Sequence, residues 1–111
     1  MDAVKDISVN DLADLLKTSE VPVQLLDVRT VAEMSQGIIP GALLASPANM
    51  GLAIEYTGIT VIYCRSGIRS AHVCRLLTQQ GCGHVLNLRH GIIAWAGAGL
   101  SITRPDEGFF S

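Results

Sequence analysis

Charged residues are scarce in this sequence of 111 residues: Asp, Glu, Lys and Arg make up 16% of it and leave a net charge of −2. Without a basic excess, the composition gives no indication of a nucleic-acid partner or of binding to an anionic membrane surface. No apolar run approaches the ~18 residues needed to cross a bilayer. Residues 1–6 lack the basic start and apolar stretch of a secretory signal, so we expect a cytoplasmic protein without a membrane partner.

Cysteine is also scarce, with Cys64, Cys74 and Cys82 as its three occurrences. An odd number of cysteines in an intracellular chain argues against a disulfide framework. Their spacing matches no zinc pattern and the three histidines do not complete one, so no metal is expected. The sequence therefore favours one reactive thiol among inert ones. Cys74 is expected in the core, whereas Cys82 follows a helix end and could be exposed.

Hydrophobic residues make up 49% of the sequence. Segments with a strand-like hydrophobic pattern alternate with segments that have a helix-like pattern. The length fits a single domain over residues 1–111. Strands are predicted at 23–28, 59–63 and 85–88, and helices at 30–36, 70–80 and 91–96. Residues 45–58 predict only a loop with one helical turn. This alternation predicts an α/β fold whose parallel sheet is covered by helices on both faces.

The segment that follows the strand 59–63 has the properties of an anion-binding loop. Cys64 comes directly after this strand, at the sheet edge where parallel α/β folds bind ligands. Backbone N–H groups of residues 64–70 can converge on its sulfur, and the next helix adds the partial positive charge of its N-terminus. Arg65 and Arg69 add two formal charges, and Gly67 permits a positive φ. Together these effects favour the thiolate and predict that Cys64 is a nucleophile.

The alternative to catalysis is a purely structural role, in which Cys64 is a small buried hydrophobic residue; this is the usual role of an isolated cysteine at a strand end. The arginines, the glycine and the strand–loop–helix context favour catalysis instead. Asp27 ends a buried strand at the same sheet edge and needs a partner. With Arg69 or the loop amides as its partner, Asp27 would organise the loop. The alternative is a purely local role, in which Asp27 caps the turn into the next helix. Arg29 and Glu33 are expected to pair with each other or with neighbours.

Residues 63–71, Tyr-Cys-Arg-Ser-Gly-Ile-Arg-Ser-Ala, resemble the active-site loop of the rhodanese family, the single-domain sulfurtransferases. Residues 26–42 resemble the family's first signature block and residues 85–95 its last. The resemblance implies a rhodanese-like α/β fold with a five-stranded parallel sheet. It also implies sulfur transfer in two displacements through a persulfide on Cys64, with no cofactor. Asp27 and Arg29 would support the loop. The residues expected to bind the substrate are those that follow the cysteine: Arg65, Ser66, Gly67, Ile68, Arg69 and Ser70.

The resemblance implies a small anionic sulfur donor such as thiosulfate, or a persulfide-donating protein, and an acceptor such as cyanide or a cellular thiol. Cysteine phosphatases place five residues between the cysteine and the arginine, whereas four separate Cys64 from Arg69. The smaller ring formed by this loop suits one sulfur atom better than a phosphate. We therefore consider phosphatase or arsenate reductase chemistry less favoured than sulfur transfer. A non-catalytic sulfur-carrier or regulatory interaction module is the alternative from another class. Ile38 and His90 replace a histidine and a glycine that are common in the family, which leaves the substrate preference open.

Overall fold

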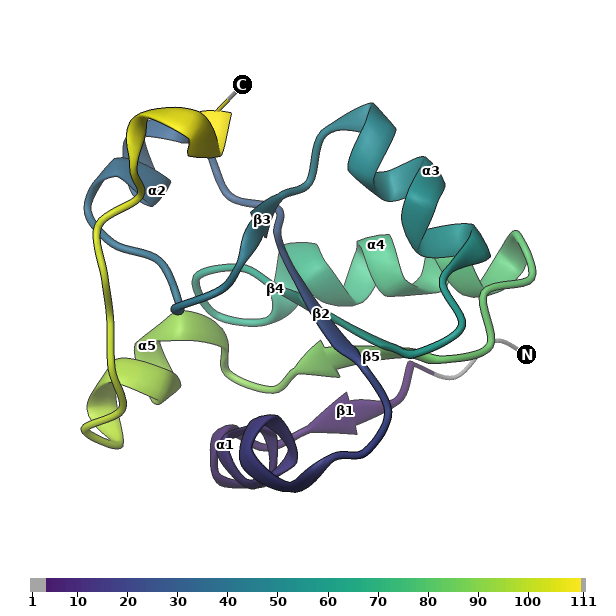
Figure 1. Ribbon diagram of the computed structural model, residues 1–111, viewed down its shortest axis with the longest axis horizontal. Coiled ribbons are helices and arrows are strands. Elements are labelled where there is room, and N and C mark those ends of the chain that lie inside the picture. The colour runs from purple at the N-terminus through teal and green to yellow at the C-terminus, as the bar shows by residue number, and fades with distance from the viewer. Residues whose placement is uncertain (1–3, 111) are drawn as a thin grey trace.

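The computed structural model describes residues 4–110 and has a five-stranded sheet in which every strand pairs in parallel with its neighbours (Figure 1). The strands, in spatial order, are β1 (Asp6–Ile7), β5 (Val85–Leu88), β4 (Ile59–Tyr63), β2 (Val23–Asp27) and β3 (Leu43–Leu44). The parallel α/β sheet predicted from the sequence is therefore confirmed. Residues 1–3 and 111 of the predicted domain lie outside the described residues.

Helices cover both faces of the sheet. On one face lie α1 (Val9–Thr18) and α5 (Gly91–Gly97), and on the other lie α3 (Pro47–Glu55) and α4 (Ile68–Gln79) (Figure 1). Successive side chains of a strand point to opposite faces. Leu25 accordingly packs with α1 and α5, whereas Leu26 packs with α3 and α4. β4 is buried from both sides, as is typical of a strand whose residues are apolar except for Thr60.

The helix α3 corrects the prediction for residues 45–58. Ser46 caps it, since its hydroxyl accepts a hydrogen bond from the Asn49 N–H at 3.1 Å. Pro47 occupies the first turn, where its missing N–H costs nothing. The prediction failed because Pro47 and Gly51 are typical of turns, whereas the buried Ala53 supplies the packing that holds the helix.

The short helix α2 (Val31–Ser35) follows the sequence prediction closely. Thr30 is its N-cap, and Thr30 and Glu33 form both halves of a capping box. This arrangement satisfies backbone donors at the start of the helix and fixes the backbone position of Glu33. The helix α4 begins at Ile68, two residues earlier than predicted, because Gly67 turns the chain in the left-handed conformation, with φ +96°.

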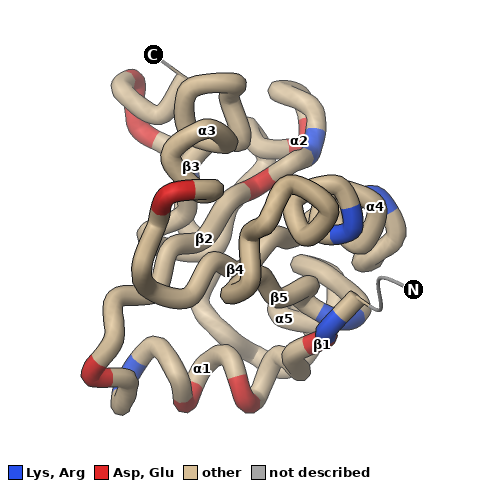
Figure 2. Tube along the Cα trace, turned by 90° about the vertical axis from the view of Figure 1, so that its right-hand side faces the viewer, with Lys and Arg blue, Asp and Glu red and all other residues tan. Residues whose placement is uncertain are grey.

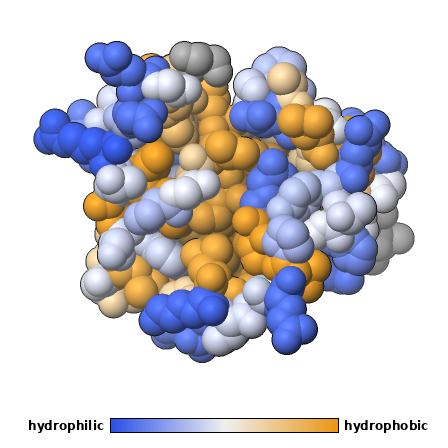
Figure 3. Space-filling model, in the orientation of Figure 1, coloured by the Kyte–Doolittle hydropathy of each residue, from blue (hydrophilic) through white to orange (hydrophobic). Residues whose placement is uncertain are grey.

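The segment after α5 runs back across the domain to a short 3-10 helix, η1 (Glu107–Phe110), that contacts β3. Thr103 pairs with Ile38 on the way through two backbone hydrogen bonds of 2.7 and 2.9 Å. The side chain of Ile38 is buried there. Figure 3 shows that the face seen in Figure 1 has an apolar centre with hydrophilic margins. Within residues 4–110, every helix is too short or too polar to cross a membrane.

Candidate active site

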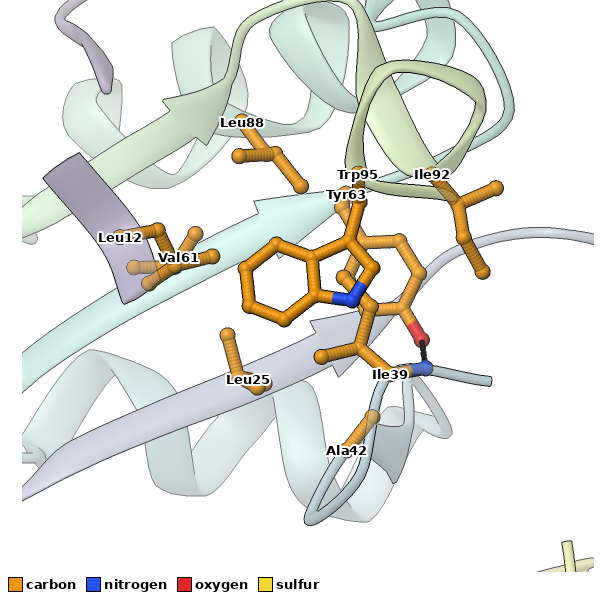
Figure 4. Packing of buried hydrophobic residues seen from close by; sticks show 9 residues of the cluster. All are labelled: Leu12, Leu25, Ile39, Ala42, Val61, Tyr63, Leu88, Ile92 and Trp95. Carbon is orange, nitrogen blue, oxygen red and sulfur yellow. Dashed lines mark hydrogen bonds between the residues drawn. The ribbon is translucent and has the colours of Figure 1, made fainter. Parts of the chain in front are cut away.

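The chain reaches Cys64 through Tyr63, the last residue of β4. The Tyr63 ring is buried in the same apolar cluster as Trp95, and its hydroxyl accepts a hydrogen bond from the Ile39 N–H at 3.1 Å (Figure 4). Burial raises the pKa of Tyr63, so the phenol stays protonated. These contacts fix the end of β4 and thereby the starting point of the loop that carries Cys64.

The loop turns its N–H groups inward because its carbonyl groups are bound from outside by α5. The N–H of Ile92 donates to the Cys64 carbonyl at 3.0 Å, and the N–H of Ile93 donates to the Arg65 carbonyl at 3.2 Å. These are N–H groups of the first helical turn, which have no partner within their own helix. Gly91 makes the approach possible, since a Cβ at this position would clash with the Cys64 and Arg65 carbonyl oxygens.

The Cys64 sulfur accepts hydrogen bonds from three groups of the loop and of α4. The Gly67 N–H lies 3.1 Å from Sγ, the Ser70 N–H 3.5 Å and the Ser70 hydroxyl 3.4 Å. Burial alone would raise the pKa of Cys64, but hydrogen bonds from the Ser70 hydroxyl and from the Ser70, Gly67 and Ser66 amides outweigh it. The pKa of Cys64 is therefore lowered. The arrangement can stabilise a thiolate, as the loop composition predicted.

Asn87 of β5 belongs to the same hydrogen-bond chain, although it was not among the predicted site residues. Its Oδ1 accepts from the Ser70 hydroxyl at 2.5 Å, and its Nδ2 donates to Asp6 Oδ1 at 3.1 Å and to the Gly67 carbonyl at 3.3 Å. The Ser70 hydroxyl has one proton, which Asn87 and the Cys64 sulfur share. A buried asparagine within an apolar strand needs polar partners. Its position in this strand was the feature of the sequence that could have identified Asn87 as part of the site.

Arg69 faces α2 and not the sulfur. Its guanidinium makes two hydrogen bonds with the Glu33 carboxylate, at 2.7 and 2.9 Å. The hydrogen bonds from Arg69 hold the pKa of Glu33 at about 2, and Glu33 in turn raises the pKa of Arg69. The positive charge that Arg69 brings to the loop is thus largely compensated. The sulfur is held by amides and one hydroxyl.

Asp27 takes the local role of the two considered from the sequence. Its carboxylate is fully buried and pairs with Arg29, whose Nη2 lies 2.7 Å from Oδ2, and it also accepts from the Arg29 N–H at 2.9 Å. Arg69, the partner considered in the other alternative, binds Glu33 and makes no hydrogen bond to Asp27 among the described residues. Arg29 donates further to the Gly37 carbonyl at 2.6 Å and lies over the Tyr63 ring. The pair braces the segment after α2 and contacts Tyr63, the residue that precedes Cys64.

The remaining residues predicted to bind the substrate are part of the loop itself. Arg65, Ser66 and Ile68 are exposed at its rim, whereas Gly67 is buried against the backbone of residues 88–90. His90 lies beside it at φ +64°, a conformation that glycine adopts without strain. No three His, Cys, Asp or Glu side chains between residues 4 and 110 lie where they could share a metal ion.

The other two cysteines lie in the core. Burial raises the pKa of Cys74 to about 12, which makes it a poor nucleophile. Cys82 is buried with 5% exposure, so the expectation that it could be exposed is wrong. Its Sγ donates to the Ala53 carbonyl of α3 at 3.6 Å, and the missed helix α3 is the reason that the sequence did not predict this burial.

Known proteins resemble the chain over most of its length. The family model described as the Rhodanese-like domain matches residues 8–98. A sulfurtransferase of Allochromatium vinosum is 48% identical over 107 residues, which cover 93% of this chain and 98% of that protein. The crystal structure of a rhodanese-like domain protein from Staphylococcus aureus has a TM-score of 0.73 and 34% identity, and the match covers 95% of each chain.

A third similar protein shows why the fold alone does not decide the chemistry. A Rhodopseudomonas palustris structure, described as a protein of unknown function and possible tyrosine phosphatase, has a TM-score of 0.79 at 24% identity, over 90% of this chain and 85% of that one. At this identity the likeness concerns the fold only. The family match over residues 8–98 and the Allochromatium relative carry the assignment: the chain belongs to the rhodanese-like domain family.

Proposed function

We propose that the protein is a sulfurtransferase that carries a sulfane sulfur as a persulfide on Cys64. The observation that carries this proposal is the set of three hydrogen bonds that converge on the Cys64 sulfur and lower its pKa. A stabilised thiolate is the nucleophile that such chemistry needs. The name of the 48% identical relative supports sulfur transfer as the reaction class.

In the first displacement, the Cys64 thiolate attacks the outer sulfur of a donor such as thiosulfate. A new S–S bond forms on Cys64, and the donor's S–S bond breaks so that its electron pair leaves with sulfite. Because Cys64 is fully buried, its sulfur has to become accessible before the donor can reach it. The loop amides then stabilise the negative charge on the outer sulfur, as an oxyanion hole would.

In the second displacement, an acceptor such as cyanide or a thiol attacks the outer sulfur. The S–S bond to Cys64 breaks, and its electron pair restores the thiolate. Neither displacement requires a metal or a cofactor. A protein that delivers its own persulfide is an equally suitable donor, because the attacked group is the same.

The position of Arg69 favours sulfur transfer over phosphate-ester hydrolysis. A phosphate held in such a loop needs a guanidinium aimed at its oxygens. Here the Arg69 guanidinium is bound by both carboxylate oxygens of Glu33. Only four residues separate Cys64 from Arg69, so the ring is also small. Both features suit a loop that holds one sulfur atom.

The proposal is tested by steady-state turnover of thiosulfate and cyanide to sulfite and thiocyanate. We expect activity in the wild type and its loss in Cys64→Ser. Cys82→Ser is the matched control, since its hydroxyl can still donate to the Ala53 carbonyl and the residue lies outside the loop. Hydrolysis of phosphate esters without transfer from any sulfane donor would contradict the proposal.

A further inference from the structure

A polar groove of about 540 Å³ lies outside the Cys64 loop, between α4 and the sheet edge formed by β5 and β1. Its wall begins at loop residues 66–68 and includes Arg75 of α4 and Arg89, which follows β5. Asn87 also lines it. Since Asn87 binds the hydroxyl that donates to Cys64, the groove extends to the hydrogen-bond chain of the site.

Two arginines give the described lining of the groove an excess of positive charge over its one carboxylate, that of Asp6. Among residues 4–110, neither Arg75 nor Arg89 has a carboxylate within salt-bridge distance. Its one acidic residue, Asp6, accepts a hydrogen bond from Asn87. Figure 2 shows basic positions on α4 and beside β1, whereas acidic positions are spaced along α1. A chain with a net charge of −2 thus presents a local cationic surface beside residues 66–68 of the loop that carries Cys64.

A second hollow borders the loop on its other side but has a different character. It encloses about 320 Å³ and is lined largely by apolar side chains, among them Ile92, Ile93 and Ile102. Its wall holds two arginines: the charge of Arg29 is compensated by Asp27, whereas Arg65, among residues 4–110, has no carboxylate within salt-bridge distance. The hollow thus offers an anion one uncompensated guanidinium in a largely apolar wall, whereas the groove offers two, and burial against apolar side chains costs the anion its hydration. An anionic ligand therefore fits the groove with Arg75 and Arg89.

We infer that this groove binds the carboxylate of a small thiol that accepts sulfur from Cys64, which rests on the function proposed above. A guanidinium holds a carboxylate through two parallel N–H donors. The bound acceptor attacks the outer sulfur of the Cys64 persulfide, and a new S–S bond forms between acceptor and outer sulfur. The bond to Cys64 Sγ breaks and returns its electron pair to the Cys64 thiolate. The acceptor's thiol proton ends on the product persulfide.

The test compares two acceptors of similar size, 3-mercaptopropionate with a carboxylate and 2-mercaptoethanol with an uncharged hydroxyl. We measure kcat/KM for each with thiosulfate as donor, in the wild type and in the double variant Arg75→Gln/Arg89→Gln. The ratio of kcat/KM between the carboxylate thiol and the uncharged thiol should fall about tenfold, since exposed charge contacts are each modest. Arg104→Gln is the control, because this exposed arginine lies outside the groove.

An unchanged ratio in the double variant would overturn the inference, and so would equal losses with both thiols, which would indicate a structural effect. If the double variant does not fold, the wild type still provides a test. Raising the ionic strength from about 0.01 M to about 1 M shortens the Debye length from about 30 Å to about 3 Å. This should reduce kcat/KM for 3-mercaptopropionate selectively, and an equal response of both thiols would count against the groove. Turnover of thiosulfate with cyanide, an acceptor without a carboxylate, tests the proposed function separately. If it persists while the groove test fails, only the inference about the groove is wrong.

Discussion

Replacing Ser70 by alanine removes one specific donor from the Cys64 sulfur. The hydroxyl at 3.4 Å is lost, whereas the Ser70 and Gly67 amides at 3.5 and 3.1 Å remain. Because the lost donor stabilises the charged form, the pKa of Cys64 should rise in Ser70→Ala. At a pH below this pKa, the thiolate fraction should fall accordingly.

The size of the rise follows from how the Ser70 proton is shared. A hydrogen bond to a charged acceptor contributes about 1.5–3 kcal/mol. The Asn87 Oδ1 atom, 2.5 Å from the same hydroxyl, competes for its proton, so the lower end applies. One pKa unit corresponds to about 1.4 kcal/mol. We therefore expect the pKa of Cys64 to rise by about one unit and the thiolate fraction to fall about tenfold.

The assay is the pH dependence of the rate at which iodoacetamide alkylates Cys64, with the modified cysteine identified by peptide mass mapping. Cys74 should not interfere, because burial raises its pKa to about 12. Ser66→Ala is the matched control, since the Ser66 side chain is exposed at the rim of the same loop. An unchanged or lower pKa in Ser70→Ala would refute the account of how the loop stabilises the thiolate.

Three further changes test the surroundings of the loop, each by chemical denaturation. Arg29→Met leaves the buried Asp27 carboxylate without its partner and should lower the free energy of unfolding by about 3–5 kcal/mol, and a loss below about 1 kcal/mol would contradict the bracing role. Glu33→Gln keeps the capping-box acceptor and removes the charge that binds Arg69, so the free energy of unfolding should fall by less than about 1 kcal/mol. Glu33→Ala also removes the acceptor and should lower it by about 1 kcal/mol more. Equal losses in the two variants would be inconsistent with the double role of Glu33. His90→Gly relieves a left-handed conformation that costs about 1–2 kcal/mol, but it adds chain entropy worth about 0.5–1 kcal/mol to the unfolded state. The free energy of unfolding should therefore rise by up to about 1.5 kcal/mol, and a clear destabilisation would argue against strain at His90.

Local sequence rules predicted the features that depend on neighbouring residues. The β-branched run 59–63 forms the central strand β4, and Cys64 follows it. The helix predicted at 30–36 forms as α2, and the structure closes a capping box between Thr30 and Glu33, which lie within one helical turn. Gly67 adopts the positive φ expected for a closed loop. In each case the cause acts within a few residues of chain.

The features that the sequence did not predict depend on contacts between distant segments. Glu33 and Arg69 are 36 residues apart, so nothing local indicated that Glu33 would bind the arginine of the loop. Asn87 reaches Ser70 from the neighbouring strand, 17 residues further along the chain. The helix α3 was hidden by Pro47 and Gly51, and its absence from the prediction left Cys82 without the element that buries it.

Intact-mass spectrometry after incubation with thiosulfate tests whether Cys64 carries a persulfide. We expect the wild type to gain the mass of one sulfur atom, cyanide to remove this mass, and Cys82→Ser to behave like the wild type. Cys64→Ser should gain nothing, since Cys74 and Cys82 are buried outside the loop. An unchanged wild-type mass, or a sulfur atom that Cys64→Ser also takes up, would contradict a persulfide on Cys64.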